Sequence, residues 1–226
     1  RQDPPFDMNY ISSTYILEKL PSSTIVLNNP TSIRNAAEKF YPFKFEKYIP
    51  PTIVTQNIEM IKNFLNEHKD IVTKPLYGNG GEGIYRSKFN DSNLNGIDEG
   101  KNFLDEPIMA QRYIPEIIDG DRRIILIDGE YFGSVARIPQ NNKLKANFHA
   151  GGKPKKTDLI YRDQEICNVL KNDLKEKNLF LVGIDIIGNY LTEINVTSPT
   201  GLKQINELNK INLEKIYWDK LESKFF

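Results

Sequence analysis

The sequence predicts an α+β protein with an antiparallel core. Helical and strand-like patterns are mixed along its 226 residues, and several strand-like runs are separated by turns short enough for hairpins. One hairpin joins 122–127 to 131–138 through Asp128-Gly129, a dipeptide typical of two-residue turns. A second hairpin spans 183–195. Hairpins pair their strands antiparallel, and this sets the predicted class.

The first half of the chain alternates short helices with strands. Thr31 or Ser32 can accept a hydrogen bond from a helical N–H, which marks the start of a helix through Phe40. The elements predicted before residue 115 are, in order, an extended segment over 1–7, a short helix that includes 15–17, a strand at 25–27, the helix through Phe40, a strand at 52–54, a helix with apolar residues at 58, 61, 64 and 65, and strands at 71–74, 84–86 and 108–114.

The second half has a long polar segment between its two hairpins. The elements predicted there are, in order, the 122–138 hairpin, a polar loop over 139–156, a helix over 163–177, the 183–195 hairpin and a helix over 202–221. The loop has five lysines and little periodicity, and loops of that length are usually functional. Cys167 is predicted to be a buried thiol rather than a nucleophile, since it shares a helical face with Ile166, Val169, Leu170 and Leu174.

Composition and charge exclude several functional classes. Thirty basic residues balance thirty acidic ones, so no overall field favours nucleic acid or a membrane surface. Hydrophobic residues make up 39% of the chain, which is enough for a core, and no apolar run is long enough to span a bilayer. One cysteine cannot form a disulfide within the chain. We therefore expect a cytoplasmic globular protein that binds neither nucleic acid nor membrane.

The 183–195 hairpin carries the clearest chemical signal. Strand alternation places Asp185, Glu193 and Asn195 on one face and apolar side chains on the other. A two-residue turn at Gly188-Asn189 would put Glu193 on the apolar face, so we expect a three-residue loop over 188–190 that pairs Asp185 with Glu193. Two carboxylates and an amide oxygen on a rigid hairpin suit Mg²⁺ rather than zinc. The alternative is an ordinary hairpin with one solvated face.

Two further segments could bind anions. The turn at 196–201 is rich in hydroxyl groups and opens a predicted helix, so its N–H groups could face an anion. The segment 74–83 contains GxGxxG, but a strand follows it, which excludes a dinucleotide-binding unit. A Walker loop would place its lysine after the glycines, and a protein kinase would need later motifs that this sequence lacks. A hairpin flap over phosphates remains, with Lys74 and Lys39 as cations.

Together these segments resemble the ATP-grasp ligases, and within them the bacterial glutathione synthetase family. The resemblance covers nearly the whole chain, in order and spacing, through the stretches Arg1-Gln2-Asp3-Pro4-Pro5-Phe6-Asp7, Asp119-Gly120-Asp121, Ala136-Arg137-Ile138-Pro139-Gln140, Ala150-Gly151-Gly152 and Thr192-Glu193-Ile194-Asn195-Val196-Thr197-Ser198-Pro199-Thr200. It implies two α+β subdomains whose antiparallel sheets enclose a nucleotide cleft. It also implies an ATP- and Mg²⁺-dependent ligase, in which Mn²⁺ could replace Mg²⁺, that joins γ-glutamylcysteine to glycine through an acyl phosphate.

The resemblance further implies roles for individual residues. The ATP phosphates would be held by Lys39 and Lys74 under a loop with Gly78, Gly80, Gly81 and Gly83, and the adenine slot would be lined by Gln111, Arg112, Tyr113 and Ile114. The metal ion would be held by Asp185, Glu193 and Asn195. The developing acyl phosphate would lie beneath Arg123 and Arg137, with the 139–156 loop carrying Asn147 over the substrate. The carboxylate end of the peptide would be bound by Ser198 and Thr200.

The chain departs from the family pattern in three places. Glu82-Gly83 stands where a small residue and Ser are expected, and Lys145 stands where an Arg is common, which keeps the charge but loses bidentate geometry. The third departure is at the N-terminus, where we expect the domain that normally precedes the 1–7 segment in this family to be missing. Residues 1–34 are predicted to connect to an N-terminal domain, 35–114 to form a small subdomain with the glycine flap, and 115–226 a large subdomain with the acidic hairpin. Because that domain would complete the peptide pocket and the subunit contacts, we expect a homo-oligomer at full length and little activity from the fragment alone.

Two alternatives stay open at this point. The chain could be an ATP-grasp ligase with another carboxylate substrate, such as a different small peptide or a protein C-terminal glutamate. It could also be a nucleotide-binding module without catalysis, which would bind ATP but release no ADP when substrates and metal are present. These alternatives are distinguished by measuring which candidate substrate is consumed and whether ADP release depends on the metal.

Overall fold

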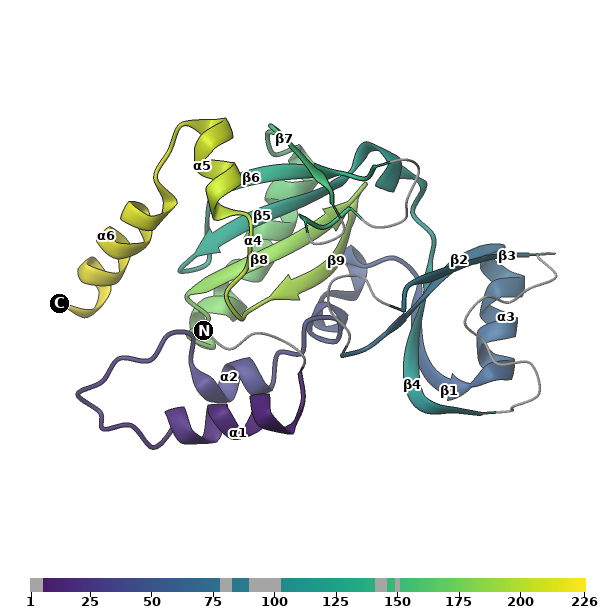
Figure 1. The fold of residues 1–226 in the computed structure, drawn as a ribbon, viewed down its shortest axis with the longest axis horizontal. Helices are drawn as coiled ribbons and strands as arrows, with labels where there is room; N and C mark the ends of the chain where they lie inside the picture. Colours follow the sequence, from purple (N-terminus) through teal and green to yellow (C-terminus); the bar gives the residue numbers. More distant parts are fainter. Residues whose placement is uncertain (1–5, 78–82, 90–102, 141–145, 149–150) are drawn as a thin grey trace.

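Two antiparallel sheets with helices packed on them form the fold (Figure 1). The structure, a computed structural model, describes residues 6–77, 83–89, 103–140, 146–148 and 151–226. One sheet has the strand order β1-β4-β2-β3 and the other β7-β6-β5-β8-β9. The predicted α+β class with antiparallel sheets is confirmed. None of the helices in these ranges is long and apolar enough to cross a membrane.

The four-stranded sheet is covered on one face by a single helix. Its strands are β1 (Thr52–Asn57), β2 (Asp70–Pro75), β3 (Tyr85–Lys88) and β4 (Phe103–Arg112), and the helix is α3 (Ile58–His68). Asn57 accepts a hydrogen bond from Glu59 N at 2.9 Å and so begins α3. Lys69 ends the helix with a φ of 65°. Ile71 of β2 packs beneath α3. Because side chains alternate along a strand, Lys74, three residues later, points to the opposite face.

The five-stranded sheet is covered on both faces. Its strands are β5 (Asp121–Ile127), β6 (Glu130–Ile138), β7 (Lys153–Lys155), β8 (Leu181–Ile187) and β9 (Tyr190–Asn195). On one face Ile124 and Ile184 pack against helix α4 (Tyr161–Glu176). On the other, Ile125 packs with residues of α5 (Leu202–Asn209) and α6 (Leu213–Phe225). Odd-numbered residues of β5, Arg123 included, therefore share the α5 face.

The N-terminal part differs from the predicted elements in two places. Helix α1 (Met8–Leu17) is confirmed, but residues 25–27 are not a strand, because they pair with no strand in the described structure. The helix predicted to run through Phe40 is only α2 (Pro30–Arg34), started by Asn29 and followed by the 3-10 helix η1 (Tyr41–Tyr48). Between these two helices the Glu38 carbonyl accepts from Ile194 N of β9 at 3.1 Å. This tertiary bond cannot be inferred from local sequence.

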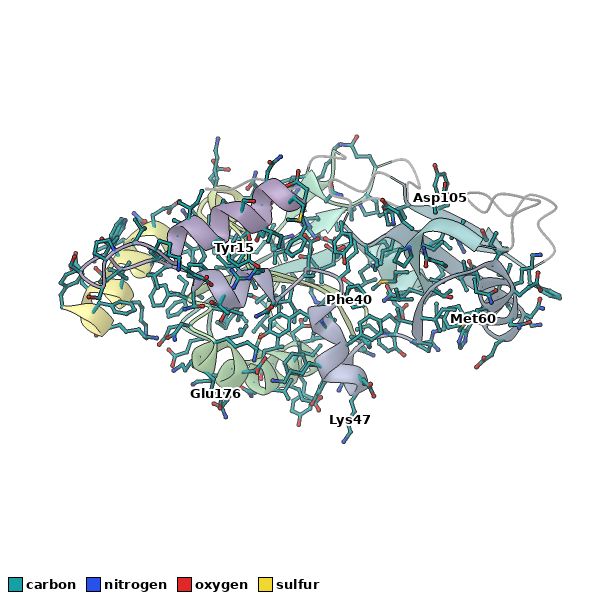
Figure 2. All side chains as sticks on the ribbon, turned by 90° about the horizontal axis from the view of Figure 1, so that it is seen from below. Tyr15, Phe40, Lys47, Met60, Asp105 and Glu176 are labelled. Carbon is teal, nitrogen blue, oxygen red and sulfur yellow. The ribbon has the colours of Figure 1, made fainter. Side chains whose placement is uncertain are left out.

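The 3-10 helix η1 packs on the end of α4. Tyr41 OH donates to Asp173 Oδ2 at 2.6 Å, and Lys44 Nζ donates to the other oxygen of the same carboxylate. Figure 2 shows Lys47 near the end of η1 and Glu176 at the end of α4 projecting from the same side of the molecule. These contacts fix η1, which begins two residues after Lys39, against α4.

The predicted C-terminal helix is divided into two. Lys210 has a φ of 55° and ends α5, and Asn212 accepts from Lys215 N at 2.8 Å and begins α6. Asn206 Oδ1 also accepts from Leu213 N at 2.8 Å, which ties the two helices together across the break. An asparagine can cap a helix as well as sit inside one, and that ambiguity hid the break from the sequence pattern.

Leu170 and Val169 test the packing of α4 as a matched pair. Leu170 is fully buried in the main core, whereas Val169, which the sequence pattern placed on the apolar face, is 39% exposed. We expect Leu170→Ala to lower the free energy of unfolding by about 2–5 kcal/mol, because it leaves a cavity. Val169→Ala should change it by less than about 1 kcal/mol. Urea unfolding measures both, and equal losses would contradict the packing described.

Candidate functional site

The acidic hairpin β8–β9 pairs as predicted, but for a different reason. Asp185 lies opposite Glu193, and Ile184 opposite Ile194, so both acids point to the same face. The predicted three-residue loop is wrong: β8 ends at Ile187 and β9 begins at Tyr190, which leaves a two-residue turn. The register instead shifts by one residue between the turn and Asp185, where Thr192 is the additional residue of a β-bulge. Thr192 Oγ1 donates to the Asp185 carbonyl at 3.1 Å and holds the bulge in place.

Asp185 is held between two arginines. Arg123 Nε and Nη2 donate to its two oxygens at 2.5 and 2.9 Å, and Arg137 Nη2 lies 2.9 Å from Asp185 Oδ2. All three residues are at most 5% exposed. Burial alone would raise the pKa of Asp185, but the two guanidinium groups outweigh it and hold that pKa well below its usual range. Asp185 is therefore a carboxylate at neutral pH.

The two arginines have further partners. Asp121 accepts from Arg137 Nε and Nη2, both at 2.6 Å, and the Thr200 carbonyl accepts from Arg123 Nη1 at 3.0 Å. Carboxylate and guanidinium groups thus alternate across β6, β5 and β8, from Asp121 through Arg137 and Asp185 to Arg123. Each buried charge faces an opposite one, as a buried charge must. The predicted pair Arg123 and Arg137 is brought together.

Two lysines from elements outside the five-stranded sheet lie near the acidic hairpin. Lys74 of β2 is buried, and its Nζ donates to Gln111 Oε1 at 3.3 Å, while Gln111 Nε2 donates to Thr52 Oγ1 at 2.9 Å. Burial lowers the pKa of Lys74, and the carboxylate of Glu193 opposes that shift. Lys39 is also buried, 3.9 Å from Glu38 Oε1. The cations of the smaller sheet and of the segment before η1 thus lie within electrostatic reach of the acids on the larger sheet.

Glu38 is a site residue that the sequence analysis missed. Burial and the neighbouring Glu193 carboxylate raise the pKa of Glu38 well above its usual range. Its carbonyl accepts from Ile194 N, so the Glu38-Lys39 pair is fastened to β9 between Glu193 and Asn195. Its only signal in the sequence is its position next to Lys39, which was named as a candidate cation for the phosphates.

The predicted adenine-slot residues occupy the junction of the two sheets. Arg112 Nη2 donates to Tyr190 OH at 2.6 Å, which ties the end of β4 to the start of β9. The Tyr113 ring lies beneath the Arg86 guanidinium at 3.4 Å. Ile114 is buried. Of the four residues, Gln111 is the one whose side chain bonds to Lys74. That these residues line a slot for adenine stays a prediction.

The turn after β9 is held close to the larger sheet. A Cβ on Gly183 would come within 2.5 Å of Pro199 Cβ, so only glycine allows this approach. Ser198 has a φ of 47°, and the Thr200 carbonyl faces Arg123 as described. The structure thus brings the predicted substrate residue Thr200 to Arg123, with Ser198 two residues before it.

Asn147 lies in a short described stretch of the 139–156 loop. Its carbonyl accepts from Gly152 N at 3.0 Å, and a Cβ on Gly152 would stand only 1.7 Å from the Ala146 carbonyl oxygen. The ring of Phe148, its neighbour, has Arg137 Cζ 5.9 Å from its centre. The loop therefore approaches Arg137. Strand β7, which the sequence analysis did not predict, lies in the same segment and pairs with β6.

Several predicted positions lie outside the described residues: Gly78, Gly80, Gly81, Glu82 and Lys145. Gly83 is described and has a φ of 69°, a conformation that favours glycine. Within the described ranges, no group of three or more His, Cys, Asp and Glu residues could hold a metal ion. The predicted set has two acids and one amide, which suits Mg²⁺, since that ion usually takes one or two carboxylates together with substrate phosphates.

Comparison with known proteins gives two matching family models. The model of the prokaryotic glutathione synthetase ATP-grasp domain matches residues 38–210, and that of the N-terminal domain of the same proteins matches residues 1–34. The glutathione synthetase of Agrobacterium fabrum is 45% identical over 226 residues, which cover 99% of this chain and 70% of the relative. That of Synechocystis sp. is 44% identical over 229 residues, with 100% and 71% covered.

Solved structures with the same fold are more distant in sequence. The ATP-grasp ligase PsnB, in complex with the precursor peptide PsnA2 and AMPPNP, has a TM-score of 0.66 at 16% identity. The match covers 89% of this chain and 63% of that one. The D-cycloserine synthetase DcsG has a TM-score of 0.67 at 13% identity, with 88% and 72% covered. At these identities the likeness concerns the fold alone, and it confirms the predicted ATP-grasp architecture.

Asp185→Asn tests the charge network through its pH dependence. At pH 7 the change leaves two buried guanidinium groups with one carboxylate fewer, so we expect the free energy of unfolding to fall by about 3–5 kcal/mol. Because the folded-state pKa of Asp185 is lowered, its contribution is present above about pH 4 and is lost as the pH falls below that value. The difference between the two proteins should therefore shrink from pH 5 to pH 3.

The measurement is urea unfolding in a metal chelator at several pH values. Asp219→Asn is the matched control, because its partner Lys215 is 69% exposed and such surface pairs contribute at most about 1 kcal/mol. A difference between wild type and Asp185→Asn that stays constant from pH 7 to pH 3 would show that Asp185 is not the charged centre of this network.

Proposed function

Because this chain belongs to the prokaryotic glutathione synthetase family, and is thereby an ATP-dependent ligase of glutathione synthesis, we propose that it joins γ-glutamylcysteine to glycine. The γ-phosphate of ATP would first move to the carboxylate of the peptide, and the glycine amine would then attack the acyl phosphate. ADP and phosphate would leave. Mg²⁺ is the proposed metal, and Mn²⁺ a possible substitute for it.

The observation that carries this proposal is the opposition of cations and acids across the site. Lys74 comes from one sheet and Glu193 from the other, yet the Glu193 carboxylate opposes the lowering of the Lys74 pKa by burial. Phosphoryl transfer needs the charge of the γ-phosphate neutralised, both by a metal ion and by fixed lysine or arginine donors. Lysines that could neutralise phosphate and acids that could hold a metal ion come from different elements here, and Lys39 is a second cation beside Glu38.

Arg123 and Arg137 are the proposed groups that stabilise the acyl phosphate. Each has three hydrogen-bond or ion-pair contacts that fix its orientation. A guanidinium carries five N–H donors, so each arginine keeps donors for a substrate. Donors held in place before the reaction need no reorganisation when charge develops. Asn147, which precedes Phe148, whose ring has Arg137 Cζ 5.9 Å from its centre, is proposed to act at the same place.

Glu193 and Asn195 are proposed to hold Mg²⁺ together with Asp185. Asn195 Nδ2 lies 3.5 Å from Asp185 Oδ2, so the three side chains meet on one face. When bound, the ion would neutralise phosphate charge that the lysines leave uncompensated. Ser198 and Thr200 are proposed to bind the carboxylate end of the peptide. Gln111, Arg112, Tyr113 and Ile114 are proposed to line the adenine slot, with the 78–83 glycine loop over the phosphates.

The division of the chain at residues 34 and 114 also remains a proposal, as do a cytoplasmic location and a homo-oligomer at full length. The two sheets lie on either side of residue 114. The balanced charge of the chain supports a small-molecule substrate rather than nucleic acid or a membrane surface.

Glu193→Gln tests the metal assignment in the ligase reaction. Removing one fixed charge from a transition-state site typically costs a factor on the order of 10²–10³ in rate, so we expect glutathione and ADP formation to fall by that factor. Glu207→Gln, an exposed position on α5, is the control and should keep the activity of the wild type. The assay follows both products with γ-glutamylcysteine, with and without glycine and Mg²⁺.

The assay is run on residues 1–226 and on the chain extended upstream to the length of its relatives. Glutathione formation undiminished in Glu193→Gln would exclude the metal assignment. ADP release that depends on a different peptide would identify a ligase with another carboxylate substrate. ATP binding without any metal-dependent ADP release would identify a non-catalytic module.

A further inference from the structure

Tyr10 joins helix α1 to the turn that follows the acidic hairpin. Its residue is 5% exposed, and its hydroxyl shares a hydrogen bond with Thr197 Oγ1. Asp7 begins α1 by accepting from Tyr10 N at 2.9 Å, so the backbone of Tyr10 is fixed as well. The contact spans 187 positions of sequence and joins the N-terminal segment to the end of β9.

The ring of Tyr10 reaches the opposite side of the site. Its centre lies 4.8 Å from that of Phe6, and Phe6 stacks on Tyr77 with centres 5.6 Å apart and planes 15° apart. Tyr77 comes two residues after the end of β2, the strand of Lys74. Tyr10 is therefore linked to the β2 side of the site through Phe6, which its ring contacts, and to the β9 side through its hydroxyl.

The turn bonded by Tyr10 is in a conformation that needs restraint. Ser198 has a φ of 47°, which is uncommon for a residue other than glycine and persists only where the surroundings hold it. After Ser198, Pro199 packs on Gly183 and the Thr200 carbonyl accepts from Arg123. Before Ser198, the Val196 carbonyl accepts from Asn28 Nδ2 at 2.7 Å, and Thr197 bonds to Tyr10. The bond to Tyr10 is the restraint at the residue next to Ser198, so Tyr10 helps to fix that end of the turn.

We propose that Tyr10 is a positioning residue for the peptide substrate. Through Thr197 it holds Ser198 and Thr200 in place, and it does so from a helix outside both sheets. The inference rests on the proposed role of Ser198 and Thr200 in binding the carboxylate of the peptide. It adds a residue that would act on the substrate through Thr197.

Tyr10→Phe removes the hydroxyl and keeps the ring contacts with Phe6. We expect the KM for γ-glutamylcysteine to rise about tenfold, the size of effect that follows from losing one hydrogen bond that orders a binding site. The KM for ATP should stay within about twofold, because Phe6 and Tyr77 keep their packing. Tyr15→Phe is the matched control: it lies on the same helix, is 50% exposed, and its ring contact with Arg34 survives the change.

Thr197→Val completes a double-mutant cycle. If the hydroxyl pair acts as a unit, Thr197→Val should raise the same KM, and the double variant should show no further increase. Additive increases, or equal increases in the KM values for ATP and the peptide, would overturn the positioning role. The same variants are compared by thermal unfolding, because a general loss of structure would affect both substrates.

Amide hydrogen exchange separates this inference from the proposed ligase function. Exchange in the peptide covering 196–201 should be faster in Tyr10→Phe than in wild type or Tyr15→Phe, whatever the substrate is. Unchanged exchange there would overturn the inference even if the protein makes glutathione. Faster exchange in a protein that makes no glutathione would keep the restraint on the turn and reject the ligase assignment instead.

Discussion

The ion pair between Arg123 and Asp185 is the interaction on which the rest of the site depends. Both side chains are buried on neighbouring strands, and a buried charge must be paired and hydrogen-bonded to be tolerated. Arg137 brings a second positive charge to Asp185, and Asp121 compensates it. The Thr200 carbonyl takes a further donor of Arg123, so the same requirement places the turn after β9. The need to pair each buried charge thus fixes the positions of groups on four separate segments.

The hairpin shows how a correct prediction can rest on an incorrect mechanism. The hydrophobic pattern requires Ile184 and Ile194 on one face, and that requirement determines the pairing of Asp185 with Glu193. The same pairing can be reached through an odd-length loop or through a bulge, and the pattern does not distinguish them. The protein uses the bulge at Thr192, whose hydroxyl bonds to the Asp185 carbonyl. Pairing was therefore predictable from sequence, whereas the backbone geometry that achieves it was not.

The features that sequence could not predict all depend on contacts between distant segments. The helix expected through Phe40 ends at Arg34, and the Glu38 carbonyl bonds to β9 instead. The role of Glu38 beside Glu193 and the bond from Tyr10 to Thr197 likewise need the folded chain. Arg123 and Arg137 were named only by resemblance, since an arginine on a strand carries no local signal of its partner. Long, strongly periodic elements were recovered, because their pattern is local.

The site combines one part held within a single sheet with another that spans two sheets. The Arg137–Asp185–Arg123 network lies on β6, β5 and β8, so its geometry is as fixed as the ladder of that sheet. The Glu193 carboxylate acts on Lys74 only because the second sheet is placed against the first, and the bond from Arg112 to Tyr190 is one polar contact that joins them. Small shifts between the sheets would therefore change the distance between cations and acids without disturbing the arginines. This arrangement suits a reaction in which a nucleotide must enter and leave, while the arginines that we propose to stabilise the acyl phosphate stay in one geometry throughout.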